Sequence, residues 1–336
     1  MSWFGARRHP GTTPLHSEGR LPGFDGATGW LNSPPLTAAD LRGKVVLADF
    51  WTYTCINWLR TLAYVRAWAE KYRDRGLVVV GVHTPEFPFE GDIENVRQAA
   101  KALRVEFPIA LDRDYGVWRA FGNRYWPAVY IADAEGRIRQ HHFGEGAYDE
   151  CEWAIQMFLR EAGDESIGDD LVSVEPDGLE AQADWTNLGS PETYVGYEQG
   201  RNFASPGGAV LDEPHTYVVP DSLRLNQWAL AGDWTIESRA CVLNRADGRI
   251  VFRFQARDVH LVLRAREPGA SVPFRVLVDG APPGDAHGLD VDEEGHGTLV
   301  QPRLYQLVRE RGSVTDRTFE ITFLAPGVEA YVFTFG

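Results

Sequence analysis

The first half of the chain alternates buried-strand patterns with helical ones. Residues 44–51 form an apolar run that predicts a buried strand, and over 55–75 apolar residues recur at helical spacing. Gly76 follows at the place where a left-handed glycine commonly ends a helix, and residues 77–82 predict the next buried strand. The order strand, helix, strand predicts a parallel pair of strands with a right-handed crossover.

The same alternation continues to about residue 162. It predicts, in chain order, a helix at 93–103, a strand at 109–111, a short helix at 117–121, strands at 128–132 and 138–142, and a helix at 148–162. The short turn between the last two strands makes them a hairpin. We therefore expect residues 1–163 to form an α/β domain, with a central mixed sheet flanked by helices.

The pattern changes after residue 163. Residues 164–184 carry acidic but no basic side chains and contain glycine and proline, which predicts a solvated linker with at most a weak strand at 171–174. Beyond it, short β-rich runs alternate with proline and glycine turns. These runs lie at 250–254, 259–263, 274–278, 319–323 and 330–335. Residues 185–336 are therefore expected to form an all-β, jelly-roll-like sandwich.

Composition narrows the possible functions. The 336 residues carry a formal net charge of −15, concentrated in the second half, so we expect neither nucleic acid nor an anionic membrane as a general partner. No run approaches the roughly 18 apolar residues that a membrane-spanning helix needs. Residues 1–8 contain arginines but no apolar run follows them, so no secretory signal is predicted.

The three cysteines, Cys55, Cys151 and Cys241, are too widely spaced for a disulfide-stapled fold or a zinc site. Free thiols suit a reducing compartment, and a cytoplasmic location is expected. His141-His142 lies on a predicted strand, where the pair is expected to alternate between surface and core rather than bind a metal. We expect no metal and no cofactor, apart from an external thiol as reductant.

Candidate chemistry gathers around Cys55. A cysteine between a buried strand and a helix start meets free backbone N–H groups and the helix dipole, which stabilise a nucleophilic thiolate. Asp49 lies inside the apolar strand before it, where a carboxyl group must be hydrogen-bonded or handle protons. Pro127 follows Trp126 at the start of a strand, a position that suits a cis-proline turn beside the cysteine.

Several segments of the chain resemble a known family. They are residues 50–57, 59–62, 123–128, 142–146, 302–308 and 326–331. The segments before residue 150 are similar to the active-site and cis-proline regions of the TlpA-like thioredoxin domain in DipZ-type thiol-disulfide interchange proteins. The later ones are similar to that family's C-terminal jelly roll, which is likened to carbohydrate-binding modules. The resemblance implies a thioredoxin fold of the redoxin type and thiol-disulfide oxidoreductase activity, without the family's membrane-embedded electron-transfer domain.

Two positions depart from the family pattern. Trp58 stands where the family has its second active-site cysteine, and Ala63 stands where it has proline. An indole cannot attack a mixed disulfide, so an intramolecular dithiol cycle through Cys55-Ile56-Asn57-Trp58 is excluded. Trp58 is expected to cover the thiol, and burial there raises a thiol pKa while the helix start lowers it.

The first functional hypothesis is a monothiol oxidoreductase with Cys55 and Asp49 as catalytic residues. Cys55 attacks a disulfide, persulfide or sulfenate of a protein or small thiol, and an external thiol or one of the other two cysteines completes the cycle. The residues expected to bind the substrate are Tyr53, Thr54, Trp58, Trp126 and Pro127.

Three alternatives stay open. The first is a redox-inactive protein in which Tyr53, Trp58 and Trp126 line a groove for a peptide or a small ligand. The second is a carbohydrate-binding module with a vestigial thioredoxin domain, and the third is a peroxiredoxin-like peroxidase, since Thr52 and Cys55 have the Thr-x-x-Cys spacing. The aromatic residues available for a sugar platform, most of them expected in the core, are Trp185, Tyr194, Tyr197, Tyr217, Trp228 and Trp234.

Overall fold

The structure is a computed structural model that describes residues 16–336, and the prediction about a signal in residues 1–8 falls outside them. The contacts of the chain divide it into two compact units. The first comprises the chain up to Thr52, Thr61–Pro85 and Ala100–Val174, and the second comprises Tyr53–Arg60, Glu86–Ala99 and Glu175–Gly336. The segment around Cys55 therefore belongs to the same unit as the β-rich half, and the domain boundaries predicted at 163 and 184 stay a prediction.

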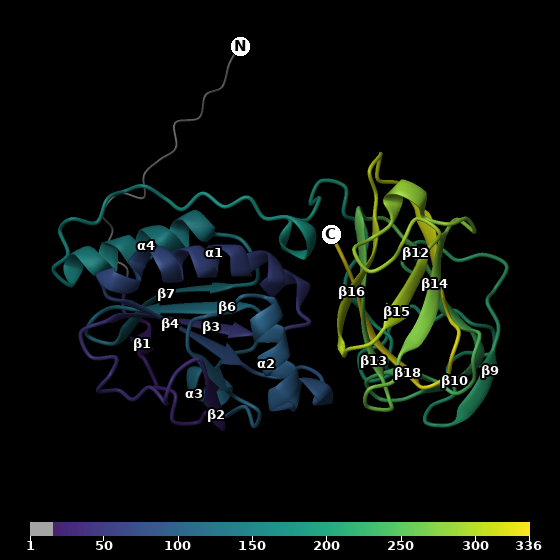
Figure 1. The fold of residues 1–336 in the computed structure, drawn as a ribbon, viewed down its shortest axis with the longest axis horizontal. Coiled ribbons are helices and arrows are strands. Elements are labelled where there is room, and N and C mark those ends of the chain that lie inside the picture. Colours follow the sequence, from purple (N-terminus) through teal and green to yellow (C-terminus); the bar gives the residue numbers. More distant parts are fainter. Residues whose placement is uncertain (1–15) are drawn as a thin grey trace, which may run out of the picture. The chain divides into compact units, whose positions relative to one another are not determined.

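The first unit is built on a seven-stranded mixed sheet, which confirms the α/β class. Its order is β1-β7-β6-β3-β4-β5-β2, with β3 parallel to β4 and β4 parallel to β5 (Figure 1). The strands are β1 (Gly19–Arg20), β2 (Gly29–Leu31), β3 (Val45–Trp51), β4 (Leu77–His83), β5 (Ile109–Leu111), β6 (Ala128–Ala132) and β7 (Arg137–Phe143). The patterns missed β1 and β2 because two or three residues are too few to show a period of two.

The predicted helices are present with small shifts at their ends. They are α1 (Ile56–Tyr72), α2 (Ile93–Ala102), α3 (Gly116–Phe121) and α4 (Tyr148–Glu161). The helix expected to reach residue 75 ends its regular part at Tyr72, because Arg73–Arg75 tighten into a 3-10 turn. Gly76 then takes the left-handed conformation that was predicted, with φ 101°. Figure 1 shows α1 and α4 running side by side.

The side chains of β3 alternate between the two faces of the sheet. Val46, Ala48 and Phe50 belong to one hydrophobic core cluster of the first unit. Asp49 therefore points to the opposite face, although it is fully buried as well. The strand ends at Trp51, and the following helix begins only at Ile56, so the chain makes a short loop before α1.

The weak strand expected at 171–174 does not form. The residues from 164 to 184 contain only a 3-10 turn at Gly178–Glu180. Instead, the N–H group of Val172 donates to the buried carboxyl group of Glu152 (2.9 Å), which also accepts hydrogen bonds from Trp68 and Tyr72. The start of the linker is thus pinned to α1 and α4 because the carboxyl group of Glu152 needs donors inside the core.

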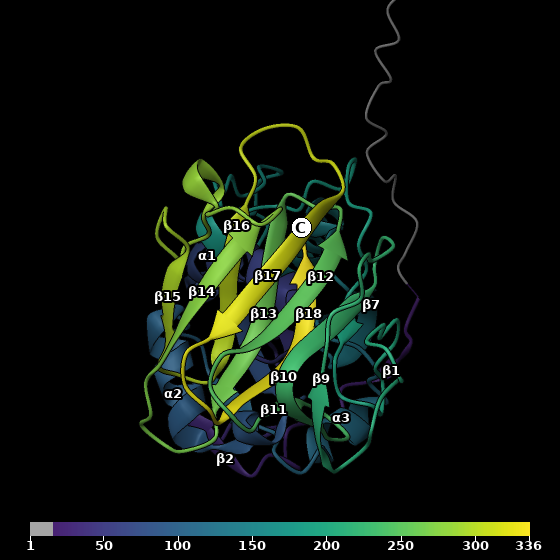
Figure 2. The ribbon, with the colours of Figure 1, turned by 90° about the vertical axis from the view of Figure 1, so that its right-hand side faces the viewer.

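The β-rich part of the second unit is antiparallel throughout its named strands, as expected for a sandwich. The strands are β8 (Thr193–Tyr194), β9 (Pro214–Tyr217), β10 (Trp228–Ile236), β11 (Cys241–Leu243), β12 (Gly248–Phe254), β13 (Asp258–Ala265), β14 (Val272–Val278), β15 (His296–Leu299), β16 (Arg303–Arg309), β17 (Arg317–Phe323) and β18 (Val328–Phe335). Strands β14, β17, β12 and β10 lie side by side in one layer (Figure 2). In the other layer β18 lies between β11 and β13.

Strand β10 joins the two layers of the sandwich. Its first half pairs with β12, and from Gly232 onward it pairs with β9 and later β11. Gly232 has φ 94°, and a Cβ atom there would lie 3.0 Å from the Cα atom of Gly248. A glycine is therefore needed at this bend, where the strand passes from one sheet to the other.

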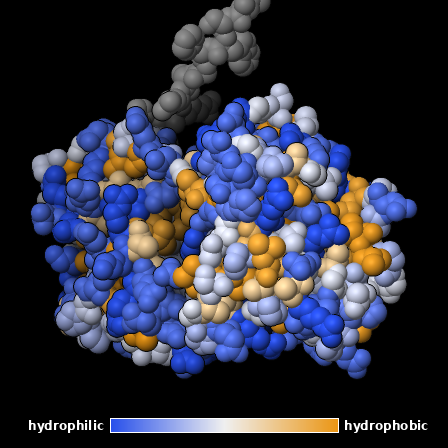
Figure 3. All heavy atoms as spheres, turned by 45° about the vertical axis from the view of Figure 1, so that its right-hand side comes forward, coloured by the Kyte–Doolittle hydropathy of each residue, from blue (hydrophilic) through white to orange (hydrophobic). Residues whose placement is uncertain are grey.

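The aromatic residues considered for a sugar platform do not form one set. Tyr217, Trp228 and Trp234 are buried in the hydrophobic core of the sandwich. Trp185 and Tyr197 are exposed, and Tyr194 is half-buried. Figure 3 shows hydrophobic residues as separate patches among hydrophilic ones on the face that it displays.

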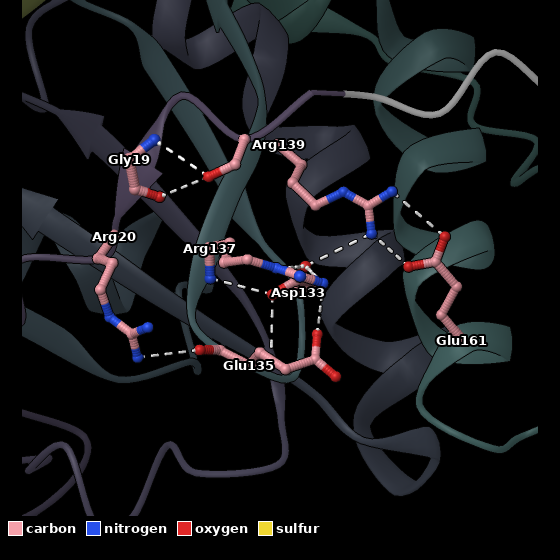
Figure 4. Close-up of polar contacts among 8 residues, drawn as sticks. Gly19, Arg20, Asp133, Glu135, Arg137, Arg139 and Glu161 are labelled. Atoms are coloured by element: carbon pink, nitrogen blue, oxygen red, sulfur yellow. Dashed lines mark hydrogen bonds and ion pairs between the residues drawn. The ribbon is translucent and has the colours of Figure 1, made fainter.

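A buried carboxyl group closes the β6–β7 hairpin of the first unit. Asp133 is 1% exposed and accepts hydrogen bonds from the backbone and side chain of Arg137, at 2.9 and 2.8 Å. Arg139 bridges Asp133 to Glu161 of α4, which ties the hairpin to that helix (Figure 4). Burial alone would raise the pKa of Asp133, but the hydrogen bonds from Arg137 and Arg139 outweigh it and lower the pKa.

Replacing this carboxyl group should destabilise the fold in a pH-dependent way. We expect Asp133→Ala to lower the free energy of unfolding by about 2 kcal/mol at pH 7, because several charge-assisted hydrogen bonds are lost. A group with a lowered pKa stabilises above its unfolded pKa of about 3.9, so the difference should shrink as the pH falls below about 4. Urea unfolding at several pH values measures it. Glu135→Ala, at an exposed partner of Arg137, is the control and should cost less than about 0.5 kcal/mol; equal losses would contradict the assignment.

Candidate functional site

Cys55 sits at the start of α1, as predicted. Its carbonyl oxygen accepts the hydrogen bond from the N–H group of Leu59 (3.0 Å), so Cys55 is the N-cap residue of the helix. The backbone N–H groups of Asn57 and Trp58 interact with the sulfur and favour its ionised form. Cys55 is half-buried and has no disulfide partner.

The carboxyl group of Glu90 fastens the Cys55 loop to another segment of the second unit. Glu90 is completely buried, and its Oε1 atom accepts a hydrogen bond from the hydroxyl group of Thr54 (2.5 Å). Its Oε2 atom accepts the backbone N–H groups of Glu86 (2.6 Å) and Phe87 (2.8 Å). Because both oxygens are used, the residue before Cys55 and the turn at 86–87 are held together. Thr54, predicted to bind substrate, is itself buried and directed at Glu90.

A second carboxyl group, that of Glu86, lies in the electrostatic surroundings of the sulfur. The hydroxyl group of Tyr194 on β8 donates a hydrogen bond to Glu86 Oε1. Arg239 donates to the backbone oxygen of Glu86 (3.4 Å). Burial and the nearby Glu90 raise the pKa of Glu86 to about 8, against the smaller lowering effects of Tyr194 and Arg239. Glu192, which is more exposed, also acts on both Glu86 and Cys55.

The balance of these effects decides the state of the Cys55 thiol. Burial raises its pKa well above the usual value, and the carboxyl groups of Glu86 and Glu192 raise it further. The N–H groups at the helix start lower it, but less than the other effects raise it. The helix start was expected to stabilise a thiolate, but in the free protein the thiol form prevails around neutral pH. Trp58 is completely buried, and its cover over the sulfur stays a prediction.

Aromatic residues lie next to the two glutamates in the sequence. Phe87 and Phe89 stack with their ring centroids 5.8 Å apart, and both contact Tyr331 of β18, at 4.8 and 5.1 Å. Tyr53, which was predicted to bind substrate, is buried beside Phe89 (6.3 Å). Desolvation in these surroundings explains why the carboxyl group of Glu86 holds its proton to a high pH.

The first turns of α1 carry another buried link within the second unit. Arg60 is 1% exposed, and its guanidinium group donates to the backbone oxygen of Phe335 on β18 (3.3 Å). The helix that presents Cys55 is thus bonded directly to the last strand of the sandwich. A buried guanidinium group that lost these acceptors would be costly, so this link fixes the helix start firmly.

The other predicted site residues belong to the first unit. The peptide bond between Trp126 and Pro127 is cis, as expected, and Pro127 is buried. Asp49 pairs with Val129 in the sheet, two residues after the cis-proline. The indole N–H group of Trp126 donates to the backbone oxygen of Thr84 (3.1 Å), and its ring lies 4.3 Å from that of Trp118. Asp49 and the cis-proline segment are therefore neighbours at one end of the sheet.

The remaining cysteines are embedded in the cores of the two units. Cys151 on α4 and Cys241 on β11 are both buried. Burial raises the pKa of Cys151 to about 12 and raises the pKa of Cys241 as well. The thiol group of Cys241 donates to the backbone oxygen of Val195 (3.2 Å). Within residues 16–336 no group of three or more potential ligands is placed to hold a metal ion.

A mixed sheet of this topology, with a cysteine at the start of the helix after β3 and a cis-proline before β6, defines a thioredoxin-like thiol protein. The family models agree with this class. Residues 21–141 match the AhpC/TSA family, and residues 190–336 match the family described as "Thioredoxin like C-terminal domain". The chain therefore combines a part that matches the AhpC/TSA family with a following part that matches this C-terminal domain family.

Several individual proteins are similar to parts of this chain. The chain is 38% identical to Protein DipZ of Mycobacterium bovis and of Mycobacterium tuberculosis over 81% of its own length and 38% of theirs. It thus spans well under half the length of these curated relatives. It is 28% identical to the thiol-disulfide oxidoreductase YkuV of Bacillus subtilis, over 42% of this chain and 95% of that one. A solved thioredoxin-like protein in the oxidised form is 30% identical, covers 43% of this chain and 96% of its own, and has a TM-score of 0.40.

The expected cytoplasmic location is wrong. It was inferred from free cysteines and from the lack of a leader or span in a sequence that covers only 38% of the DipZ chains. A solved relative, a disulfide oxidoreductase of Mycobacterium tuberculosis that is 17% identical, is a secreted protein. In the described part of the chain, no helix is both long and apolar enough to cross a membrane.

Sequence reasoning missed Glu86, Glu90, Tyr194 and Glu192. Glu86 and Glu90 follow the apolar run of β4 within the stretch Glu86-Phe87-Pro88-Phe89-Glu90, where acids that flank aromatic residues were a signal of buried carboxyl groups. Tyr194 carried no such signal, because its contact with Glu86 joins residues 108 positions apart. Only the folded chain brings the two groups together.

The high thiol pKa predicts slow alkylation of Cys55 near neutral pH. In a Cys151→Ala/Cys241→Ser variant, where Cys55 is the sole thiol, the rate with iodoacetamide should rise with a midpoint clearly above 8.5, the value for a free cysteine. The same variant unfolded in urea is the control and should give about 8.5. A folded midpoint at or below the unfolded one would mean that the helix start outweighs burial and the carboxyl groups.

Proposed function

We propose that this protein is a monothiol thiol-disulfide oxidoreductase in which Cys55 is the reacting group. The observation that carries the proposal is the position of Cys55: it is the N-cap residue of α1 and only half-buried, whereas Cys151 and Cys241 are enclosed in cores. Trp58 occupies the place of a second thiol, and its indole cannot resolve a mixed disulfide. The cycle therefore needs a thiol from outside the motif.

The reaction follows ordinary thiol-disulfide exchange. Cys55 loses its proton, and the thiolate attacks one sulfur of a disulfide; the new S–S bond forms as the old one breaks, and the other sulfur leaves as a thiolate that takes up a proton. Cys55 is then part of a mixed disulfide. An external thiol attacks the substrate sulfur of this mixed disulfide, which releases Cys55 and leaves a disulfide between the external thiol and that half of the substrate. A further external thiol breaks this bond, so two external thiols are oxidised to a disulfide while the substrate disulfide is reduced to two thiols. Because only the thiolate attacks, a raised pKa predicts turnover that is slow at neutral pH and faster in alkali.

The substrate is proposed to be a disulfide- or thiol-bearing protein or a small thiol. Trp126 and Pro127, which precede β6, are proposed to contact an extended substrate segment, because the side chain of Trp126 is only half-buried there. Asp49 is proposed to handle protons, because it is buried at the same end of the sheet. The buried side chains in this loop are those of Tyr53, Thr54 and Trp58. Because they are buried, they support the loop around Cys55 more than they contact the substrate.

A second candidate is a redox-inactive binding protein. The raised pKa of the Cys55 thiol favours it, since a protonated, partly enclosed thiol is a weak nucleophile. The same feature argues against a peroxidase, whose first step also needs a thiolate. A sugar site on the sandwich finds no support in the aromatic residues, because Tyr217, Trp228 and Trp234 are core residues.

Replacing the sulfur of Cys55 separates the two candidates. With glutathione as the external thiol, the wild type should reduce 2-hydroxyethyl disulfide and insulin, and Cys55→Ser should reduce both only at the background rate. The Cys151→Ala/Cys241→Ser variant is the matched control and should keep its activity, since those thiols are buried. If the wild type is no faster than glutathione alone between pH 7 and 9.5, the oxidoreductase proposal falls and the binding protein remains.

A further inference from the structure

The phenol group of Tyr194 links the sandwich to the residues around Cys55. Strand β8 pairs with β18 through Tyr194 and Val332, so the backbone of Tyr194 is anchored in the sheet. Its hydroxyl group donates to Glu86, and its electrostatic neighbours are Glu86, Glu192 and Cys55.

The backbone of Glu86 is hydrogen-bonded at both its N–H group and its carbonyl oxygen. Its backbone N–H group is bonded to Glu90 (2.6 Å), and its backbone oxygen accepts a hydrogen bond from Arg239. The side chain, by contrast, accepts a hydrogen bond from the hydroxyl group of Tyr194. The backbone fixes where Glu86 stands, and Tyr194 fixes where its carboxyl group points.

We propose that Tyr194 is a positioning residue of the Cys55 site: its hydroxyl group holds the carboxyl group of Glu86 beside the sulfur, and the sandwich thereby restrains the thiol. The inference rests on the proposed function, because it concerns what controls the pKa of the same Cys55 thiol. In this role Tyr194 acts on the sulfur through the carboxyl group of Glu86.

The charged groups around the site set the sign of the effect. Glu86 and Glu192 face Cys55, while Glu90, Glu192 and Arg239 face Glu86. A carboxylate beside the sulfur opposes thiolate formation, because two negative charges repel each other in poorly solvated surroundings. The Tyr194 hydrogen bond favours the charged form of Glu86 and keeps it in place. Loss of the hydroxyl group leaves Glu86 neutral to a higher pH and free to turn away, so the thiolate forms more easily.

The test reads the sulfur directly, by the pH dependence of iodoacetamide alkylation in the Cys151→Ala/Cys241→Ser variant. Tyr194→Phe should lower the midpoint by about half a pH unit and Glu86→Gln by about one unit or more, as for the removal of a neighbouring charge. In the presence of Glu86→Gln, the additional Tyr194→Phe change should have no further effect. The matched control is Tyr72→Phe, which removes a hydroxyl group that donates to another buried carboxyl group, that of Glu152, and should leave the midpoint unchanged.

Two outcomes would overturn the inference. An unchanged midpoint in Tyr194→Phe would show that its hydroxyl group does not restrain the thiol. An equal shift with and without Glu86→Gln would show that Tyr194 acts by packing alone. Thermal unfolding of each variant checks that the fold is kept, and Tyr194→Leu, which also removes the ring, replaces Tyr194→Phe if that variant fails to fold. Because alkylation needs no turnover, the result stands apart from the disulfide assay, whose failure would remove the proposed function alone.

Discussion

The arrangement of the site depends on one buried carboxyl group, that of Glu90. A fully buried carboxyl group is tolerated only when its oxygens are satisfied, and here Thr54, Glu86 and Phe87 supply the donors. Those donors come from two segments that are separated along the chain, so satisfying the two oxygens also joins the loop before α1 to the turn after β4. The position of Glu86 near Cys55 follows from this requirement.

The same requirement explains why the pKa of the Cys55 thiol is raised. A helix start normally favours a thiolate, and the N–H groups of Asn57 and Trp58 do so here. The effect is outweighed because burial of the sulfur raises its pKa most, and the carboxyl groups of Glu86 and Glu192 raise it further. Burial and like charge act in the same direction, and one helix terminus cannot compensate for both.

The division of contacts gives the sandwich a part in the thiol site. Tyr53–Arg60 and Glu86–Ala99 group with residues 175–336, and specific bonds account for this: Arg60 to Phe335, and Tyr194 to Glu86. The C-terminal domain that accompanies the redoxin domain therefore supplies groups to the surroundings of the cysteine. Because Trp58 stands in place of a second thiol, the reactivity of Cys55 depends on these groups of the C-terminal domain.

The sequence alone determined the elements whose pattern is local. The period of β3 and α1, the left-handed Gly76, the cis peptide before Pro127 and the place of Cys55 at the helix start were all predicted, because each depends on residues a few positions apart. Strands β10 and β16 and most of the shorter strands were missed, although β5 was predicted, since pairing with distant strands stabilises them more than their own sequence does. Only the tertiary structure decided the state of the thiol, because Glu86 and Tyr194 lie far from Cys55 in the sequence and their effect depends on burial and hydrogen bonding in the folded chain.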